Sequence, residues 1–462
     1  MIVAAVGLFG FLSNESGHFI DTCKCGSARQ IAAVGGANLA AWGRATQPYL
    51  RDIVPRRFHG GFLAPPLVVN PPVPVEFSHR IIRRRAKRGT ALRIKSIEPI
   101  AVNLPMKKPV KMAGETVTRA NNVFVRIEAD TGAVGWGEAA AAPTMTGETV
   151  ASMMAAIGHM APLLLKRAAD DFAGAMAAMH VQMYGNTGAK AAIEIALHDL
   201  VGRVRGQPLH ALLGEKCRDR IPLLAVIGSG NTAGDLREAH ERRSAGFTIF
   251  KLKVGFDTPE ADAARTRTVC EALGRDALIS VDANQGFGPE EGERYVRAVG
   301  DCGLGLFEQP VHSHDLAGMA RVAAASGVAI GADEGIHSLD DIERHHAAKA
   351  ARGVSLKAIK LGGVRAVVAA SRLCERLGMN VNISCKTGES SVASAAALHV
   401  AAVAPVLAWG LTITSPGLAE DVVAEPLVID RGHIAVLNGP GLGVTVDERR
   451  VRRWQQDFRK VA

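Results

Sequence analysis

Short apolar runs alternate with longer segments of helical pattern through the second half of this 462-residue sequence. Runs of this length, bounded by helical segments, are typical of buried parallel strands. The runs cover residues 222–227, 247–254, 278–282, 304–308, 328–333, 358–361, 380–384 and 406–411. Eight strands that alternate with helices predict a (β/α) barrel of the TIM type, although the pattern alone also permits a doubly wound parallel sheet.

Charged residues end five consecutive runs, whereas a buried parallel strand is expected to be apolar. These residues are Lys251 and Lys253, then Asp282, Glu308, Asp333 and Lys360. From Lys253 onward, successive members lie 29, 26, 25 and 27 residues apart, and each step is about the length of one βα unit. Because the carboxyl ends of barrel strands meet at one mouth, where such enzymes do their chemistry, the sequence predicts a single shared site.

The three carboxylates of this set predict a metal site. Carboxylates that share a site raise one another's pKa unless a cation lies among them. Asp282, Glu308 and Asp333 offer only hard oxygen ligands. Such ligands select Mg²⁺, with Mn²⁺ as a possible substitute, rather than Zn²⁺.

The lysines of the set predict acid/base chemistry. Side chains two residues apart share one face of a strand, so Lys251 and Lys253 are both expected to point inward. Neighbouring ammonium groups destabilise each other's charge, so one of them can become a base near neutral pH. Lys360, four strands further on, is expected to face Lys253 across the barrel. The α-carbon of a bound carboxylate would then lie between two amines.

The ordered set resembles the pattern of the enolase superfamily, and within it the muconate-lactonizing (mandelate racemase/muconate cycloisomerase) family. That pattern has a K-x-K on the second barrel strand, Asp, Glu and Asp ligands on the next three, and a lysine on the sixth. Smaller signatures agree, and the likeness runs from about residue 92 to the C-terminus. They are Gly135-Trp136-Gly137-Glu138, Ala191–Asp199 with Pro208–Gly214, Gly362-Gly363, Gly388-Glu389-Ser390 and Gly439–Gly443.

The resemblance implies a modified TIM barrel with an N-terminal α+β capping domain. It implies that Lys253 is the acid/base on one face of the substrate, that Lys251 tunes it, and that Lys360 serves the other face. It also implies roles for residues close to these. Glu389 corresponds to a family glutamate near the substrate carboxylate, and Asn284 and Glu334 correspond to partners of the metal ligands and lysines.

A change of composition near residue 91 predicts the domain boundaries. Residues 1–91 carry twelve Lys and Arg against four acids, so they hold +8 of the net charge of +9. We expect this basic leader to be disordered, and its lack of interleaved aromatic residues predicts no nucleic-acid partner. The remaining ranges are predicted to be the capping domain (92–218), the barrel (219–426) and a C-terminal segment that returns to the capping domain (427–462).

Other features predict a cytoplasmic protein. No run reaches the ~18–20 apolar residues of a membrane span, and no basic region precedes the apolar N-terminal stretch, so neither a membrane nor a secretory route is expected. The seven cysteines form no C-x-x-C pair, which favours reduced thiols. The resemblance implies a homo-oligomer that acts on a small carboxylate.

Cationic residues predict how a diacid would bind. Lys107, Lys108 and Lys111 make the first loop of the capping domain cationic, and Lys386 adds charge near the seventh strand. We hypothesise that these lysines receive a second carboxylate, as muconate would require. The alternative is that they only solvate a mobile lid.

The sequence predicts a metal-dependent lyase or isomerase that forms an enolate, and a muconate-type cycloisomerase in particular. The alternatives are a racemase or epimerase of an amino-acid derivative, a dehydratase of the same group, and a barrel that binds without catalysis. The stretch Thr412–Pro416 lacks the Asp-x-Asp that dipeptide epimerases carry near the eighth strand. A mandelate-racemase-like site is disfavoured because the seventh strand reads Asn382-Ile383-Ser384, without histidine.

Overall fold

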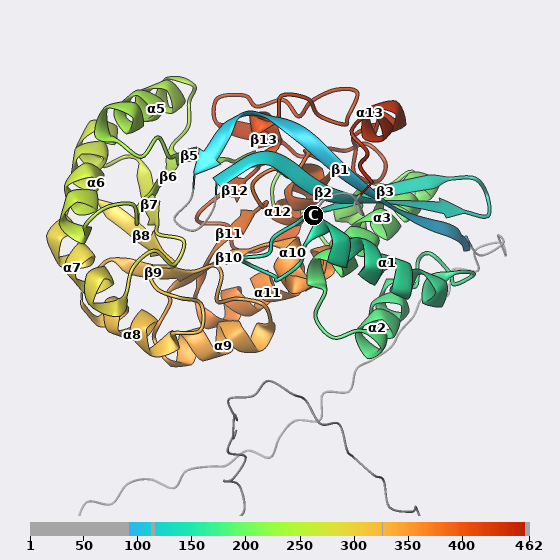
Figure 1. The fold of residues 1–462 in the computed structure, drawn as a ribbon, viewed down its shortest axis with the longest axis horizontal. Coiled ribbons are helices and arrows are strands. Elements are labelled where there is room, and N and C mark those ends of the chain that lie inside the picture. Colours follow the sequence, from blue (N-terminus) through green and yellow to red (C-terminus); the bar gives the residue numbers. More distant parts are fainter. Residues whose placement is uncertain (1–91, 112–115, 326, 458–462) are drawn as a thin grey trace, which may run out of the picture. The chain divides into compact units, whose positions relative to one another are not determined.

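The structure, a computed structural model, describes residues 92–111, 116–325 and 327–457, with the side chain of Lys111 excluded. The predicted basic leader therefore lies outside the described residues. Figure 1 shows the order of the elements along the chain. Within these described ranges, no helix combines the length and the apolar character of a bilayer span.

The first part of the described chain is an antiparallel sheet covered by helices. Three strands, β1 (Ile94–Lys111), β2 (Thr116–Ala129) and β3 (Val134–Ala140), pair in the order β1-β2-β3. Three main helices follow, and a short one leads into the barrel. These are α1 (Val150–Leu164), α2 (Phe172–Gln182), α3 (Thr187–Arg205) and α4 (Leu209–Leu213). Apolar residues of these strands and of α1, α2 and α3 form one core, which Ile359 of the barrel joins, while others, such as Phe124 and Trp136, belong to the core of the barrel.

The second part is an eight-stranded parallel barrel. Its strands pair in sequence order from β5 to β12, and a parallel bridge between Leu223 and Leu411 joins the first strand to the last. The strands are β5 (Leu224–Ile227), β6 (Ile249–Lys253), β7 (Leu278–Asp282), β8 (Leu304–Glu308), β9 (Ala329–Ala332), β10 (Gly353–Leu356), β11 (Asn380–Ser384) and β12 (Leu411–Thr412). The predicted fold class, a barrel with an α+β capping domain, is confirmed.

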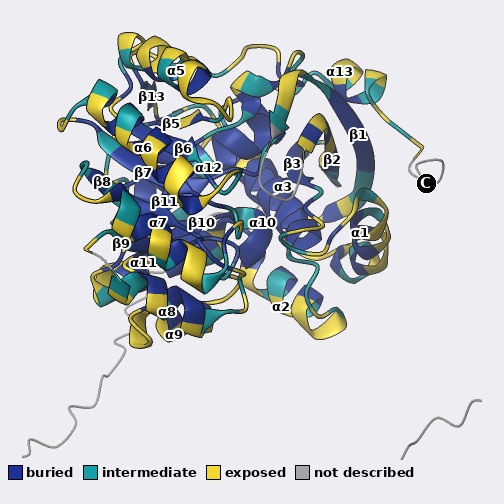
Figure 2. Cartoon of the chain, turned by 60° about the vertical axis from the view of Figure 1, so that its left-hand side comes forward, coloured by how far each residue is buried: buried dark blue, intermediate teal, exposed yellow. Residues whose placement is uncertain are grey.

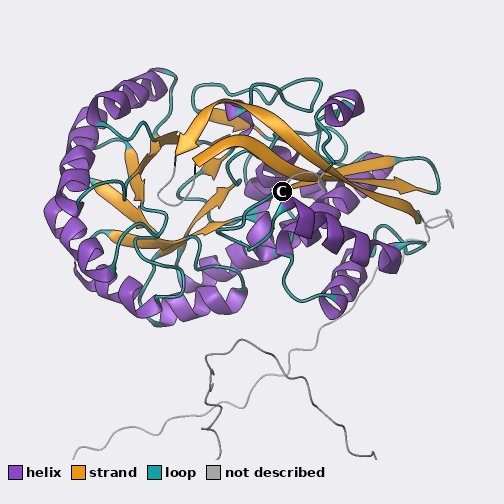
Figure 3. Cartoon of the chain, in the orientation of Figure 1, coloured by secondary structure: helices purple, strands orange, loops and turns teal. Residues whose placement is uncertain are grey.

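Helices surround the barrel strands, as Figure 3 shows in purple around orange. They are α5 (Thr232–Ser244), α6 (Pro259–Leu273), α7 (Pro289–Val299), α8 (Leu316–Ala325), α9 (Leu339–Ala347), α11 (Val364–Leu377) and α12 (Ser391–Val403). Local sequence sets their ends: the Thr258 side chain accepts from the Ala261 amide to begin α6, which ends at Gly274. In Figure 2 the strands are mostly buried, and the exposed residues lie on the outer faces of the helices.

The predicted sixth strand, residues 358–361, is wrong. Those residues form a single helical turn, α10 (Ala358–Leu361), which Gly362 closes in the left-handed conformation at φ 88°. The sixth strand is instead β10, which holds Ser355 in its centre. A short apolar run does not distinguish a strand from a helical turn. The predicted eighth strand, residues 406–411, is also displaced, since only Leu411 and Thr412 pair.

The C-terminal segment runs back to the first sheet. β13 (His433–Ala435) pairs with β4 (Arg220–Pro222), and a short helix, α13 (Glu448–Arg453), follows. The next residues reach the edge of β1: the Asn103 amide donates to the Trp454 carbonyl at 3.0 Å, and the Gln456 amide donates to the Ala101 carbonyl at 2.8 Å.

Candidate active site

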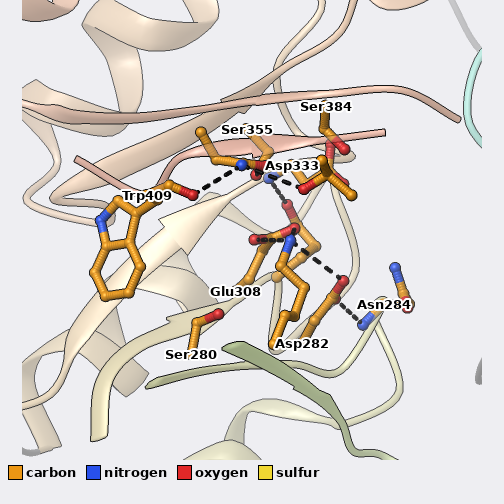
Figure 4. A network of polar contacts seen from close by, with 12 residues as sticks. Ser280, Asp282, Asn284, Glu308, Asp333, Ser355, Ser384 and Trp409 are labelled. Atoms are coloured by element: carbon orange, nitrogen blue, oxygen red, sulfur yellow. Dashed lines mark hydrogen bonds and ion pairs between the residues drawn. The ribbon is translucent and has the colours of Figure 1, made fainter. Parts of the chain in front are cut away.

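The predicted carboxylates end three neighbouring strands of the barrel. Asp282 is the last residue of β7, Glu308 is the last residue of β8, and Asp333 directly follows β9. The strand register places Lys253 opposite Asp282 and Asp282 opposite Glu308. Figure 4 shows the three carboxylate side chains directed toward the same region of the barrel mouth. The structure thus brings the predicted cluster together.

The two lysines of β6 form ion pairs with these carboxylates. The Nζ of Lys251 lies 2.6 Å from the Oε2 of Glu308 and 4.0 Å from the Oδ2 of Asp282. The Nζ of Lys253 lies 2.7 Å from the same Oδ2. Burial disfavours the charged form of Lys251, but the charges of Glu308 and Asp282 outweigh burial and raise its pKa.

Lys357 is a candidate site residue that the sequence did not reveal. It follows β10 directly, is buried, and forms an ion pair with the Oδ2 of Asp333. Burial opposes its charge, but Asp333 and Glu308 raise its pKa. Lys357 lies 24 residues after Asp333, so the spacing could have found it if Gly353–Leu356 had been recognised as the strand.

Lys360 does not lie at a strand end as predicted, because it sits on the helical turn α10. Its fully buried ammonium donates to the Oδ1 of Asp333 at 2.6 Å, to the Ser355 carbonyl at 2.9 Å and to the Asp333 carbonyl. These acceptors use all three N–H bonds of the ammonium group. Burial lowers the pKa of Lys360. The arrangement ties β9 to β10 and fits a structural support better than a proton carrier.

Asn284 and Glu334 extend the network outward from Lys253. The Nζ of Lys253 donates to the Oδ1 of Asn284 at 2.6 Å, and the Nδ2 of Asn284 donates to the Oε1 of Glu334 at 3.0 Å. Asn284 adopts the left-handed conformation at φ 43°, which asparagine tolerates better than most residues. Burial and the charge of Asp333 raise the pKa of Glu334 to about 7.

Gln309 is a second supporting residue that the sequence analysis did not identify. It is fully buried and adopts φ 36° directly after Glu308. Its Oε1 accepts hydrogen bonds from the amides of Asp333 at 2.8 Å and Gly335 at 3.2 Å. The Gln309 side chain therefore joins the end of β8, which carries Glu308, to the backbone of Asp333.

Glu389 lies in the loop after β11, where the first sheet meets the barrel. Its Oε2 accepts from the Lys386 amide at 2.8 Å, and its Oε1 accepts from the Ala140 amide at 3.4 Å. Burial raises the pKa of Glu389 to about 7, although the charges of Lys386 and Lys357 oppose this rise. Both Glu389 and Lys386 are buried.

The capping lysines point to other partners. Lys107 donates to the Pro416 carbonyl at 2.9 Å, and Lys108 forms an ion pair with Glu238 at 2.6 Å. These contacts direct both amines toward barrel loops, so neither is assigned to the substrate. The side chain of Lys111 lies outside the described residues.

The donor set fits a hard divalent cation in its chemistry. Asp282, Glu308 and Asp333 are buried and offer only carboxylate oxygens, which suit Mg²⁺. Among the acidic, histidine and cysteine residues that the structure describes, no three lie in the arrangement of a metal-ligand group. Ammonium groups lie between the carboxylates here and compensate their charge. The buried Oε2 of Glu334, beside the cluster, accepts no hydrogen bond from any described residue.

Comparison with known families divides the chain at the same place as the fold. Residues 96–214 match the model of the mandelate racemase / muconate lactonizing enzyme N-terminal domain. Residues 235–450 match the enolase C-terminal domain-like model. The two matches together cover most of the described chain.

Individual relatives share sequence over nearly their whole length. A chloromuconate cycloisomerase from Cupriavidus necator is 32% identical over 368 residues, covering 79% of this chain and 99% of that protein. An L-Ala-D/L-Glu epimerase from Clostridium acetobutylicum is 32% identical over 355 residues, covering 76% and 98%. The crystal structure of muconate lactonizing enzyme from Pseudomonas fluorescens, complexed with muconolactone, is 33% identical with a TM-score of 0.76, covering 79% and 100%.

Enzymes of this family depend on a metal ion. The buried cluster of carboxylates and lysines occupies the barrel mouth, where the chemistry of such folds takes place. The chain belongs to the mandelate racemase/muconate lactonizing enzyme family of the enolase superfamily, and it is an isomerase of that superfamily.

Proposed function

We propose that the enzyme is a Mg²⁺-dependent cycloisomerase of the muconate type, which interconverts a dienoic diacid and its lactone. One observation carries this proposal. Lys253 ends β6 and Lys357 follows β10, and the three strands that lie between them in the barrel carry Asp282, Glu308 and Asp333. The amines therefore flank the carboxylate cluster from both sides, so that either one can exchange a proton with the carbon next to a bound carboxylate.

Asp282, Glu308 and Asp333 would hold the Mg²⁺ ion. When bound, the ion supplies electrostatic stabilisation of the charge that develops on the substrate carboxylate. Asn284 orients Lys253 through the 2.6 Å hydrogen bond. Gln309 keeps the Asp333 backbone in place.

Lys253 moves the proton. In the lactone-opening direction its neutral amine accepts the proton from the carbon next to the carboxylate. The electron pair of that C–H bond forms the enolate, which then expels the ring oxygen as the second carboxylate and leaves the diene. In the closing direction the carboxylate oxygen adds to the diene, and the Lys253 ammonium returns the proton to carbon.

Lys357, in place of the predicted Lys360, is the acid/base candidate for the opposite face. A lactonisation in which addition and protonation share one face needs only one of the two lysines. We also assign the second carboxylate of the substrate to Lys111 and Lys386. Glu389, buried beside Lys386 and Lys357, is assigned to the carboxylate next to the reacting carbon.

The second candidate is a racemase or epimerase of an amino-acid derivative. It is favoured by the same pair of lysines, since inversion at carbon needs one proton carrier on each face. The epimerase relative is as similar in sequence as the cycloisomerase relative. Its substrate would use the same carboxylate cluster.

Incubation in D₂O distinguishes these functions. The purified enzyme with Mg²⁺ is given muconates, muconolactones, and N-acylated and free amino acids. Loss of the diene absorbance supports lactonisation, and deuterium at the α-carbon without net conversion supports epimerisation. If neither appears with any of these substrates, the proposal is rejected.

The oligomeric state, the cellular compartment and the domain limits at residues 92, 219 and 427 stay predictions. Size-exclusion chromatography with light scattering tests the first. The described C-terminal residues contact β1 by the hydrogen bonds given above.

A further inference from the structure

Two sequence motifs, one in the first sheet and one in the barrel, meet in the structure. Residues 135–138, Gly-Trp-Gly-Glu, lie on β3 of the capping sheet, and residues 388–390, Gly-Glu-Ser, lead into α12 of the barrel. The contact is made by Glu138, whose side chain is fully buried. Its carboxylate reaches the first turn of α12, directly beside Glu389.

Both oxygens of the Glu138 carboxylate are fully engaged. The Oε1 accepts from the Asn122 side chain at 2.6 Å and from the Ser390 amide at 2.9 Å. The Oε2 accepts from the Ser390 hydroxyl at 2.5 Å and from the Ala393 amide at 3.1 Å. A carboxylate at this position satisfies amides that an α-helix leaves unpaired at its N-terminus. Glu138 therefore fixes the start of α12 to the capping sheet.

The strand that carries Glu138 is itself held rigidly. A β-carbon added to Gly137 would lie 1.9 Å from the Ala192 carbonyl oxygen, and one added to Gly135 would lie 2.3 Å from the Ala196 carbonyl oxygen. Only glycine permits β3 to pack this closely against α3. The position of the Glu138 carboxylate is thus set by backbone contacts as well as by its own hydrogen bonds.

The same sheet holds the loop on the other side of Glu389. The Asn122 side chain donates to the Gly388 carbonyl at 2.9 Å, and the Ala140 amide donates to the Glu389 carboxyl at 3.4 Å. Gly388 adopts φ 94°, and an added β-carbon would lie 2.9 Å from the β-carbon of Ala120. Residues 388–390 are therefore held between β2, β3 and the barrel.

The two carboxyls also interact through charge. Burial first, and then the charge of Glu389, raise the pKa of Glu138 to about 8, although the hydrogen bonds from Ser390 and Ala393 oppose this rise. The other ionisable groups that face Glu389 are Lys386 on its own loop, Cys385 at the end of β11 and Lys357 at the end of β10. Two like charges in a buried site titrate as a coupled pair, which keeps one proton to a higher pH than either group would alone.

We propose that Glu138 of the capping domain is a positioning residue of the active site, which places the Glu389 carboxyl at the barrel mouth and couples its charge to a second carboxyl. This inference rests on the proposed role of Glu389 at the substrate carboxylate. It makes the capping sheet a part of the catalytic geometry and not only a cover.

The test compares Glu138→Gln with a matched control, Glu194→Gln. Glu194 is also a buried carboxylate of the capping domain, and it also caps a barrel helix, since it accepts from the Val364 amide at 2.5 Å at the start of α11. Turnover is measured from pH 6 to pH 9 with the substrate that the D₂O experiment identifies. Thermal unfolding of each variant is followed over the same range.

Glu138→Gln is expected to lower kcat by roughly 10- to 100-fold, with less effect on KM, because the Glu389 carboxyl is misplaced. The alkaline limb of the pH profile should move to lower pH by about one unit, because the pair has lost one carboxyl. Glu194→Gln should leave both the limb and kcat unchanged. A limb that moves in both variants, or in neither, overturns the proposal.

Glu138→Asp guards against misfolding of the glutamine variant. It keeps the charge but shortens the reach, so the alkaline limb should stay at its original pH while kcat falls. A wild-type kcat in Glu138→Asp, together with a stable fold, also overturns the proposal.

A measurement without turnover separates this inference from the proposed function. If the wild-type enzyme converts no substrate, the proposed function fails. The interaction of Glu138 with Glu389 is then measured by a double-mutant cycle of Glu138→Gln and Glu389→Gln, with the free energy of unfolding at pH 8.5 as the measured quantity. Non-additive effects support the coupled pair, provided that Glu194→Gln and Glu389→Gln are additive. Additive effects of Glu138→Gln and Glu389→Gln overturn the proposal.

Discussion

Lys357 and Asp333 form a buried ion pair that joins the end of β10 to the end of β9. The other oxygen of the same carboxylate accepts from Lys360 at 2.6 Å. One carboxylate thus has two lysine partners, but their surroundings differ. Lys357 extends from the strand end toward the cluster, whereas Lys360 is fully enclosed and has two further backbone acceptors.

Replacing each lysine by methionine should separate these roles. Lys357→Met is expected to lower racemisation, or deuterium exchange on the second face, by roughly 10²- to 10⁴-fold, the usual contribution of a general acid or base. Lys360→Met is expected to destabilise the fold by roughly 3 kcal/mol, because it leaves buried acceptors and a buried carboxylate with less compensation. Exchange kinetics and denaturant unfolding measure the two effects. A stable Lys360→Met enzyme that loses exchange, beside an active Lys357→Met enzyme, would reverse the assignment.

Removal of divalent metal should abolish turnover. Chelation followed by dialysis is expected to give an inactive enzyme that Mg²⁺ restores. Asp282→Asn should raise the Mg²⁺ concentration needed for half-maximal activity by at least about 100-fold. Loss of a residue that only supports a metal ligand typically lowers metal affinity about 10- to 100-fold, and loss of a ligand itself should cost more. Calorimetric titration with Mg²⁺ checks the same loss without substrate. Full turnover after rigorous chelation would be incompatible with the proposal.

The lysines assigned to the second carboxylate should discriminate diacids from monoacids. Lys111→Met and Lys386→Met are each expected to raise KM for a diacid about tenfold more than KM for a monoacid, which corresponds to ~1.4 kcal/mol. Lys108→Met is the matched control, because Lys108 is paired with Glu238. An equal effect on both substrate classes would remove the assignment.

Glu194 should make stability depend on pH. Burial raises its folded-state pKa from 4.5 to about 7, so the folded protein binds a proton more tightly than the unfolded chain. The resulting stabilisation is complete below pH 4.5 and is lost as the pH rises toward 7, by about 3 kcal/mol. Glu194→Gln, compared with wild type by chemical denaturation between pH 5 and pH 8, should show a smaller decline over this range. Parallel curves would show that Glu194 does not titrate there.

Close packing at Gly137 should tolerate no side chain. Gly137→Ala is expected to destabilise the fold by about 3 kcal/mol, because its β-carbon meets the Ala192 carbonyl oxygen at 1.9 Å. Gly158→Ala is the control: Gly158 lies inside α1, where an added β-carbon meets nothing within 4 Å. Alanine there should stabilise the helix by roughly 0.5–1 kcal/mol. Thermal unfolding of the two variants should shift in opposite directions.

The sequence alone was sufficient to predict the barrel and most of the charged cluster, because both depend on spacing along the chain. Lys253, Asp282 and Glu308 each end a strand, and the steps between them are those of successive βα units. Lys360 was placed incorrectly because Ala358–Leu361 is as apolar as a strand, while the real strand contains the polar Ser355, which hydrogen-bonds Asn382.

Contacts between distant segments could not be predicted in this way. Glu138 and Ser390 are 252 residues apart in the chain, and no periodicity relates them. Lys108 was expected to face the substrate. Its partner in the structure, Glu238 on α5, lies 130 residues away, so nothing in the sequence indicated this ion pair. Such pairings depend on how the first sheet docks on the barrel, which a single sequence does not encode in any local pattern.

The pairing between β1 and residues 454–456 bears on the order in which the enzyme assembles. Val102 forms an antiparallel bridge with Gln455, so the last described residues cover the outer edge of the first strand. A ribosome releases these residues only after all eight barrel strands have been made. The outer edge of β1 therefore stays unpaired by this tail throughout synthesis, and the pairing that covers it can form only after the whole barrel sequence has left the ribosome.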